Sequence, residues 1–481
     1  MEIFLKLLDL RELYWMGLLT IPFIIILMIK SQKFALYIII LVVYLLEWLN
    51  TSFYLIPRSA IWIKNIAMLV LFFRVLFLIS LNRRVIKTPI DLTVISLLIV
   101  ILISSIGNGV SLISGFLGFR RHFTYIIFFY LISYLDFDES YLKKMVSLIV
   151  LIALIQIPVS IAEFILWKPG LISGPASGHY DFITGTLPRG SSGYLSLFLL
   201  AIVCICLGFG QVRQKVMILG LKIKPFILTV LLLVPLPFTL SRATFLFLPL
   251  VIGFTALRQK SWNWRQKLLS RRLIFVYFVF FLAIIVLGSR VTDYDIGNYI
   301  LNPKKAINEQ FDPSTSKTGA EIGRIASLQL IYELQRDNWF NLIFGFGSGS
   351  WSKSYFNEYS GDRWKLYKDQ YVSETSQMAF SLSEFGFLGC IIFLILLYKM
   401  FKMNEELLNK SRDEYWRSVS YGFRGIIFLT FLASFYVTIL DGDSYVFMLM
   451  TLGGIINRVR NRYKETLNSN DRFPVINSNH S

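Results

Sequence analysis

The sequence predicts an all-α integral membrane protein, a polytopic helical bundle of about 12 to 14 transmembrane helices with one large external loop. Of its 481 residues, 55% are hydrophobic and only 16% are charged, and the mean hydropathy is +0.60. A soluble protein of this length would need more charge on its surface. The apolar residues also form long runs between short charged clusters, which is typical of a chain that crosses a membrane repeatedly.

Each predicted span is an apolar run that approaches the length of about 20 residues needed to cross a bilayer as a helix. In chain order the predicted spans are 14–30, 34–50, 60–80, 91–107, 121–135, 144–167, 190–209, 225–240, 243–257, 273–289, 376–400, 422–438 and 443–457. The chain 1–481 is therefore expected to form a single polytopic membrane domain.

Lysine and arginine concentrate in alternate connections, which the positive-inside rule assigns to the cytoplasm. These connections contain Arg83, Arg84 and Lys87; Lys143 and Lys144; Arg213, Lys215, Lys222 and Lys224; the cluster 258–272; Lys399 to Arg417; and the tail at 459–481. The opposite side then receives 108–120, 168–189, Ser241-Arg242, the turn at 441–444 and the long segment 290–375. Because that segment holds Trp339, Trp351 and Trp364, we expect a folded extracytoplasmic loop rather than a disordered linker.

The net charge of +18 fits the same positive-inside bias, so nucleic acid is not an expected partner. Neither a metal cluster nor a cofactor motif is evident. The cysteines are Cys204, Cys206 and Cys390, all within apolar runs, and the histidines are His122, His179 and His480, widely scattered.

One arginine, Arg242, stands inside the almost unbroken apolar stretch "FTLSRATFLFLPL" at 238–250. The two flanking runs are short, so the tip of this hairpin is expected near the outer headgroups. An arginine there either marks the loop by snorkelling or holds an anion, for which the planar guanidinium is suited. The residues alone leave both interpretations open.

The external segment contains a second arginine at the start of a predicted helix, 324–335. Ile325, Leu328, Ile331 and Leu334 give this helix an apolar face, and Arg324 stands where free N–H groups favour an anion. The "GFGSGS" stretch that follows has no nucleotide-binding spacing, so a turn is preferred over a phosphate cradle.

Two acidic residues accompany the next membrane helix. Glu374 lies just outside it and is either a helix-start acid or a base for a hydroxyl group. Glu384 lies further in, where a structural ion pair is favoured over catalysis.

Four ordered stretches resemble the bacterial O-antigen ligase and polymerase superfamily of membrane glycosyltransferases. They are "GTLPRGSSGYLSLFLLA" at 185–201, "LSRATFLFLPL" at 240–250, "GRIASLQLIYEL" with "NLIFGFGSGSW" within 323–351, and "SLSEFGFLGCIIFL" at 381–394. The resemblance covers roughly residues 170 to 400. It implies an enzyme of the bacterial cytoplasmic (inner) membrane with its active site on the extracytoplasmic side. It also implies transfer of a glycan from undecaprenyl diphosphate to an acceptor hydroxyl, with diphosphate-binding arginines at Arg242 and Arg324.

The sequence departs from the ligases at one position. Ligases carry a histidine shortly before the acid-x-Gly-x-x-Gly helix entry, whereas this chain reads "SETSQMAF" there. Glu374 becomes the nearest candidate base and His179, in "GPASGHYDF", a second candidate. Arg189, in the same loop, is a further candidate for binding the diphosphate.

The resemblance therefore predicts a polymerase of undecaprenyl-diphosphate-linked repeat units of a surface polysaccharide such as an O-antigen, capsule or exopolysaccharide. Carrier-linked glycans serve as both donor and acceptor, and a chain-length regulator and a flippase are candidate partners. The first alternative is an O-antigen ligase that transfers the glycan to lipid A core. An alternative of another class is a lipid-linked oligosaccharide flippase, for which Glu47, Arg74 and Glu163 are the few intramembrane charges.

Overall fold

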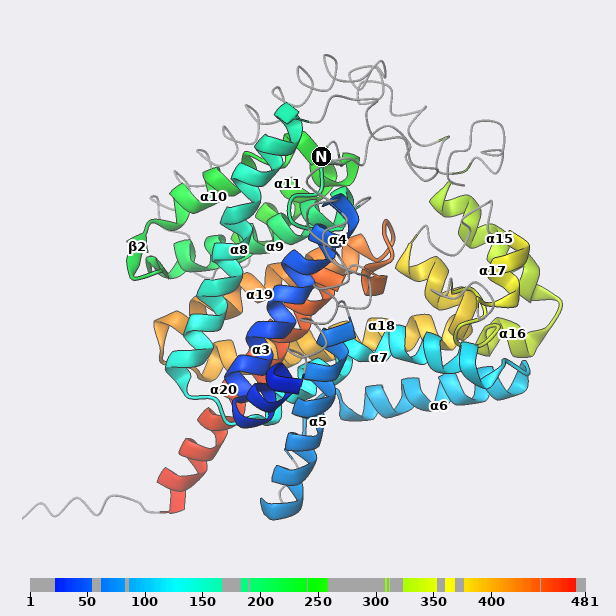
Figure 1. Cartoon of the computed structure of the whole chain (residues 1–481), viewed down its shortest axis with the longest axis horizontal. Coiled ribbons are helices and arrows are strands. Elements are labelled where there is room, and N and C mark those ends of the chain that lie inside the picture. Colours follow the sequence, from blue (N-terminus) through cyan, green and yellow to red (C-terminus); the bar gives the residue numbers. More distant parts are fainter. Residues whose placement is uncertain are drawn as a thin grey trace, which may run out of the picture. The chain divides into compact units, whose positions relative to one another are not determined.

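The computed structural model describes residues 22–53, 62–82, 86–166, 183–188, 191–239, 241–257, 308, 311, 323–352, 360–367, 376–441 and 443–472, and these are almost entirely helical (Figure 1). The helices are α3 Gln32–Leu41, the π-helical turn η1 Val42–Leu46, α4 Glu47–Phe53, α5 Ile63–Asn82, α6 Asp91–Gly107, α7 Leu112–Tyr134, α8 Glu139–Leu166, α9 Ser192–Val212, α10 Pro225–Leu233, the 3₁₀ turn η3 Pro237–Thr239, α11 Arg242–Leu257, α15 Arg324–Arg336, α16 Trp339–Phe344, α17 Asp362–Tyr367, α18 Gln377–Lys410, α19 Glu414–Ala433, the 3₁₀ turn η8 Ile439–Asp441 and α20 Asp443–Arg472. The predicted all-α membrane fold is confirmed.

Five helical stretches within the described part of the chain are long and apolar enough to cross a membrane. They are Gln32–Ser52, Ile63–Leu81, Glu139–Ile165, Ser192–Val212 and Gln377–Lys410, and shorter apolar helices lie at Asp91–Gly107, Pro225–Thr239 and Leu246–Thr255. The predicted span 273–289 lies outside the described residues, as does the first part of the span 14–30.

The chain divides into two compact units. The first holds residues 1–86 with two short later segments, and the second holds the remainder. In the first unit, α3 packs on α5 through buried residues that include Leu36, Ile39 and Leu71. Arg74 donates from Nη1 to the carbonyl of Ile29 at 3.3 Å, so this intramembrane arginine has a structural partner.

In the second unit the core is formed by α9 and α19, which lie side by side (Figure 1). The two backbones approach closely where both helices carry glycine. A Cβ atom at Gly208 would lie 2.2 Å from the carbonyl oxygen of Ser418, and one at Gly422 would lie 2.5 Å from the Cα of Ile205. The α9–α19 contact therefore depends on small residues, as is common between membrane helices.

The basic connections of the second unit meet at one end of the bundle. Lys143 Nζ lies 2.9 Å from Asp413 Oδ2, and Gln214 Nε2 donates to Glu414 Oε2 at 3.0 Å. Arg462 also donates to the carbonyl of Phe137. The connections at 137–144, 213–224 and 411–417 and the end of α20 therefore share one side, which confirms this part of the predicted grouping.

Two local predictions are corrected by the structure. The connection 213–224 contains a β-hairpin, β1 Val216–Ile218 paired antiparallel with β2 Leu221–Ile223, for which no strand was expected. The predicted span 422–438 was placed too late in the chain, because α19 ends at Ala433. The charged residues Glu414 and Arg417 obscured the start of α19, which lies before the predicted span. Arg424, inside that span, is only 6% exposed and is paired with Glu405 at 2.6 Å.

Candidate functional site

The turn between α19 and α20, residues 434–441, receives the N-terminus of α18. The Gln377 amide donates to the carbonyl of Val437 at 2.9 Å, and the Met378 amide donates to that of Ser434 at 3.0 Å. The side chain of Gln377 accepts the N–H of Leu440 at 3.0 Å. Because Gln377 is fully buried, these contacts fix where the chain enters α18.

Tyr436 of this turn contacts both arginine-bearing elements. Arg324, the first residue of α15, donates from Nε to the carbonyl of Tyr436 at 2.6 Å, and its guanidinium carbon lies 3.8 Å from the centre of the Tyr436 ring. The edge of the same ring meets Phe247 of α11, with ring centres 5.9 Å apart and planes at 86°. The cation–π contact and the hydrogen bond together hold the Arg324 guanidinium in place.

The family-like stretch at 185–201 reaches the same turn through Tyr194 of α9. Its hydroxyl donates to the carbonyl of Thr438 at 2.8 Å and lies 3.0 Å from the Thr438 hydroxyl. Stretches that lie far apart in sequence therefore converge on residues 434–441. The sequence prediction placed only a turn at 441–444 here and missed Tyr436 as a contact, because an aromatic residue at the end of an apolar run gives no distinguishing signal.

The structure describes two of the predicted site residues and leaves three outside the described part of the chain. Arg242 is the first residue of α11, and Arg324 is the first residue of α15, where the N-cap Gly323 provides no side-chain cap. Glu374, His179 and Arg189 lie outside the described residues.

A second group of buried polar residues surrounds Glu384 of α18. Glu384 and His122 are 0% and 1% exposed, and His122 Nε2 lies 3.0 Å from Glu384 Oε2. The other carboxylate oxygen accepts the hydroxyl of Ser352 at 2.8 Å and the N–H of Trp351 at 3.3 Å. The structural pairing expected for Glu384 is thus present, with His122 as a partner that sequence spacing could not reveal.

In the turn formed by the "GFGSGS" stretch, three backbone N–H groups donate to acceptors on other segments. The amides of Phe346 and Gly347 donate to the carbonyls of Ser383 and Glu384, and that of Ser348 donates to the hydroxyl of Ser105. Amides bound in this way are not available to a phosphate, which supports a turn rather than a cradle.

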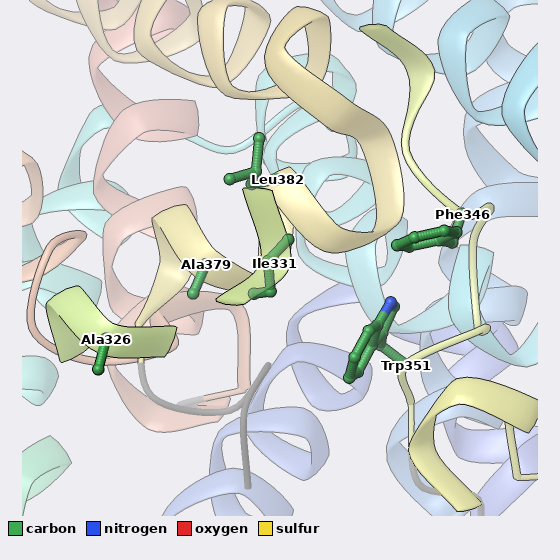
Figure 2. Close-up of a cluster of buried hydrophobic side chains, with 6 residues drawn as sticks. All are labelled: Ala326, Ile331, Phe346, Trp351, Ala379 and Leu382. Carbon is green, nitrogen blue, oxygen red and sulfur yellow. The ribbon is translucent and has the colours of Figure 1, made fainter. Parts of the chain in front are cut away.

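Hydrophobic packing attaches this turn and α15 to α18. Figure 2 shows Ile331 of α15 beside Ala379 and Leu382 of α18, with Phe346 and Trp351 of the glycine-rich turn in the same cluster. Leu328 and Leu334 pack against it, so the predicted apolar face of α15 is confirmed at these positions and at Ile331. The segment 324–351 is therefore held by a buried core, and Arg324 is positioned by that core as well as by Tyr436.

Glu163, one of the charges considered for a transporter, also has a structural partner. It is 5% exposed, and its Oε2 accepts the N–H groups of Thr184 at 3.0 Å and of Gly185 at 2.7 Å. The carboxylate thus stabilises the glycine-threonine turn that precedes α9.

Part of the chain matches a known family. Residues 227–394 match the family model described as O-Antigen ligase, a region that contains the stretches at 240–250, 323–351 and 381–394. No curated protein matches the chain. The apolar helices and this match together support lipid-linked glycans in a membrane as the general class of substrate. Over residues 227–394 the chain is therefore similar to the O-Antigen ligase family, which supports the O-antigen ligase/polymerase superfamily, and its apolar helices agree with a multi-pass membrane protein.

Proposed function

We propose that the protein is a glycosyltransferase that polymerises undecaprenyl-diphosphate-linked oligosaccharide repeat units on the outer face of the cytoplasmic membrane. The observation that carries this proposal is the convergence on Tyr436 of Arg324 and of α11, the helix that begins at Arg242. Arg324 begins α15, and α11, which begins at Arg242, meets the same turn through Phe247, five residues further along the helix. Both arginines and both helix dipoles favour the same ligand, a diphosphate.

The proposed role of the arginines is to stabilise the leaving group. As the bond between the anomeric carbon and the phosphate oxygen breaks, the carrier diphosphate leaves with the electron pair. Fixed positive charge close to the oxygen that gains charge lowers the barrier. Because the Nε–H of Arg324 is engaged by Tyr436, the two terminal nitrogens of its guanidinium are the ones that would bind phosphate. Arg189 is proposed as an additional positive charge for the carrier.

The acceptor hydroxyl forms the new glycosidic bond and must lose its proton. Glu374 is the proposed base, because α18 begins shortly after it and is bound to the same turn that holds Arg324. His179 is the second candidate. Donor charge and acceptor base would then lie on neighbouring elements, as the transfer requires.

Two alternative functions, a ligase and a flippase, are compared with the same observations. A ligase would bind the same donor and transfer its glycan to lipid A core, but the chain lacks the histidine that ligases carry before the α18 entry. A flippase would move lipid-linked glycans without chemistry through a polar cavity. Two of its three candidate charges, Arg74 and Glu163, bind backbone groups in the structure, so these two residues give a flippase no support.

Deletion of the gene, followed by gel analysis of the surface glycan, separates these functions. A polymer reduced to single repeat units indicates a polymerase. Full-length polymer that stays on its carrier indicates a ligase, and repeats that accumulate on the cytoplasmic side indicate a flippase.

Arginine variants then test the site in the deletion strain. We expect Arg242→Ala and Arg324→Ala to abolish polymer with the protein still in the membrane. The loss of one charge-assisted contact costs about 1.5–3 kcal/mol and slows each transfer by roughly ten- to a hundredfold, and polymer is lost because every added repeat unit requires that transfer. Arg242→Lys should also be poor if the contact is bidentate. Arg336→Ala is the matched control, because Arg336 ends the same helix with its side chain 59% exposed. Normal chain length in Arg324→Ala would remove that residue from the site.

A further inference from the structure

The β-hairpin at the basic end of the bundle exposes an apolar tip. Met217, Leu219 and Leu221 are 51%, 79% and 66% exposed, whereas Val216 and Ile218 of the same hairpin are buried. Exposed aliphatic side chains at the end of a turn are unusual on a surface that faces water.

Leu219 also adopts a backbone conformation that its side chain disfavours. Its φ is +49° and that of Gly220 is +83°, so both central residues of the two-residue turn have positive φ. Such hairpin turns prefer Asn-Gly or Asp-Gly, and a bulky residue in this region is an outlier. A strained leucine that is also exposed suggests that its side chain has a partner outside the chain.

The charges within the segment that carries the hairpin are of one sign. Residues 213–224 contain Arg213, Lys215, Lys222 and Lys224, which are all exposed, and no aspartate or glutamate. Apolar side chains surrounded by cations complement a surface that has an apolar interior and anionic headgroups.

The position of the hairpin along the chain favours lipid over protein as the occupant. Only residues 213–215 separate it from α9, a candidate membrane span, and only Lys224 separates it from the apolar helix α10. A three-residue strand is about 10 Å long, so the tip stays close to the helix ends and hence to the bilayer surface.

From these observations we propose that the 216–223 hairpin inserts Met217, Leu219 and Leu221 into the membrane leaflet at the basic end of the bundle, while the four surrounding cations bind anionic phospholipid headgroups. This surface anchors the junction of α9 and α10 and is independent of the proposed catalytic site.

Spin labelling of the full-length protein in vesicles tests the proposal. A label on Leu219→Cys, in a Cys390→Ser background, is compared with one on Arg412→Cys in the connection between α18 and α19 at the same end. The remaining cysteines, Cys204 and Cys206, are fully buried. Collisions with oxygen report an apolar surrounding, and collisions with a water-soluble nickel chelate report water.

We expect the ratio of oxygen to chelate collisions to be several-fold higher at position 219 than at 412. It should rise further when phosphatidylglycerol replaces part of the phosphatidylcholine. In the double variant Lys222→Glu and Lys224→Glu, phosphatidylglycerol should no longer raise the collision ratio at position 219. A rise that persists in this variant would overturn the role of the cations. Equal chelate access at both labels would place the tip in water, and shielding of position 219 from both reagents would indicate a covering protein. Either result would overturn the proposal.

Discussion

Glu384 shows how a carboxylate is accommodated within an apolar helix of this protein. Burial of an isolated charge is costly, but here each carboxylate oxygen has hydrogen-bonding partners: His122 on one side, Ser352 and the N–H of Trp351 on the other. The partners come from α7 and from the glycine-rich turn. One side chain thus ties together three segments that are distant in the sequence.

Removal of this carboxylate should destabilise the protein. Glu384→Ala leaves the buried groups of His122 and Trp351 without their acceptor, and loss of one partner of such a buried pair costs about 3–5 kcal/mol. We expect a lower unfolding temperature in detergent and a lower abundance in the membrane. Glu384→Gln, which keeps an acceptor oxygen, should be milder. Glu333→Gln on the exposed face of α15 serves as the control, and equal unfolding temperatures for Glu384→Ala and this control would contradict the role.

At the scale of elements, α18 is interrupted at Gly386, where φ is +65° and ψ is −165°. This position follows Glu384 closely and faces the backbone of the glycine-rich turn. A Cβ atom at Gly386 would lie 2.4 Å from the carbonyl carbon of Ile343, and one at Gly345 would lie 2.4 Å from that of Glu384. The acid-x-Gly pattern therefore has a structural cause: the acid binds the turn, and the glycine allows the two backbones to cross.

Gly386→Ala should consequently be destabilising by more than the about 1–3 kcal/mol that a residue other than glycine pays in this sparsely populated conformation, because backbone atoms must also move. A thermal unfolding scan measures the effect. Gly253→Ala in α11 is the matched control, since a Cβ atom there meets nothing within 4 Å and alanine favours a helix by up to about 1 kcal/mol. If the two variants unfold at the same temperature, the crossing does not constrain α18.

The connection between α18 and α19 should make stability depend on pH. Burial by itself would raise the pKa of Asp413, but hydrogen bonds from Lys143 and from the N–H of Tyr415 outweigh it and hold the pKa below its usual value. A lowered pKa in the folded state adds stability above about pH 4, and this contribution is lost as the pH falls through the folded value.

Lys143→Met should therefore lower the unfolding temperature at neutral pH, by an amount typical of a partly exposed pair, about 1 kcal/mol or less. It should also weaken the decline in stability on acidification. Lys144→Met, at an exposed neighbouring position, should do neither. An unchanged acid profile in Lys143→Met would show that the pair with Asp413 does not contribute to the pH dependence.

At the scale of the molecule, the second unit has two chemically different ends. One end collects the basic connections around Asp413 and Glu414, and the other holds the 434–441 turn with Arg324 and Tyr194. From the positive-inside rule we expect the basic end to face the cytoplasm and the Tyr436 end to face the outside.

Cysteine labelling on right-side-out vesicles tests this orientation. We expect a membrane-impermeant maleimide to label Asp337→Cys, whose native side chain is 91% exposed, and to label Arg412→Cys only after permeabilisation. The unsubstituted protein gives the background from its three native cysteines. The reverse pattern would place Arg324 on the cytoplasmic side and contradict the proposed polymerase.

The sequence by itself determined the membrane class, the predominance of apolar helices and the shared side of the basic connections. These properties depend on the hydrophobicity and charge of neighbouring residues, which a single sequence contains. It also indicated Arg324 at a helix start and an ion pair for Glu384. Only the tertiary structure decided that His122 is the partner of Glu384 and that the backbones at Gly386 and Gly345 pass in close contact. It also decided that Tyr436 contacts both Arg324 and α11. Such contacts join residues more than 40 positions apart, and side chains of ordinary type give no local signal of them.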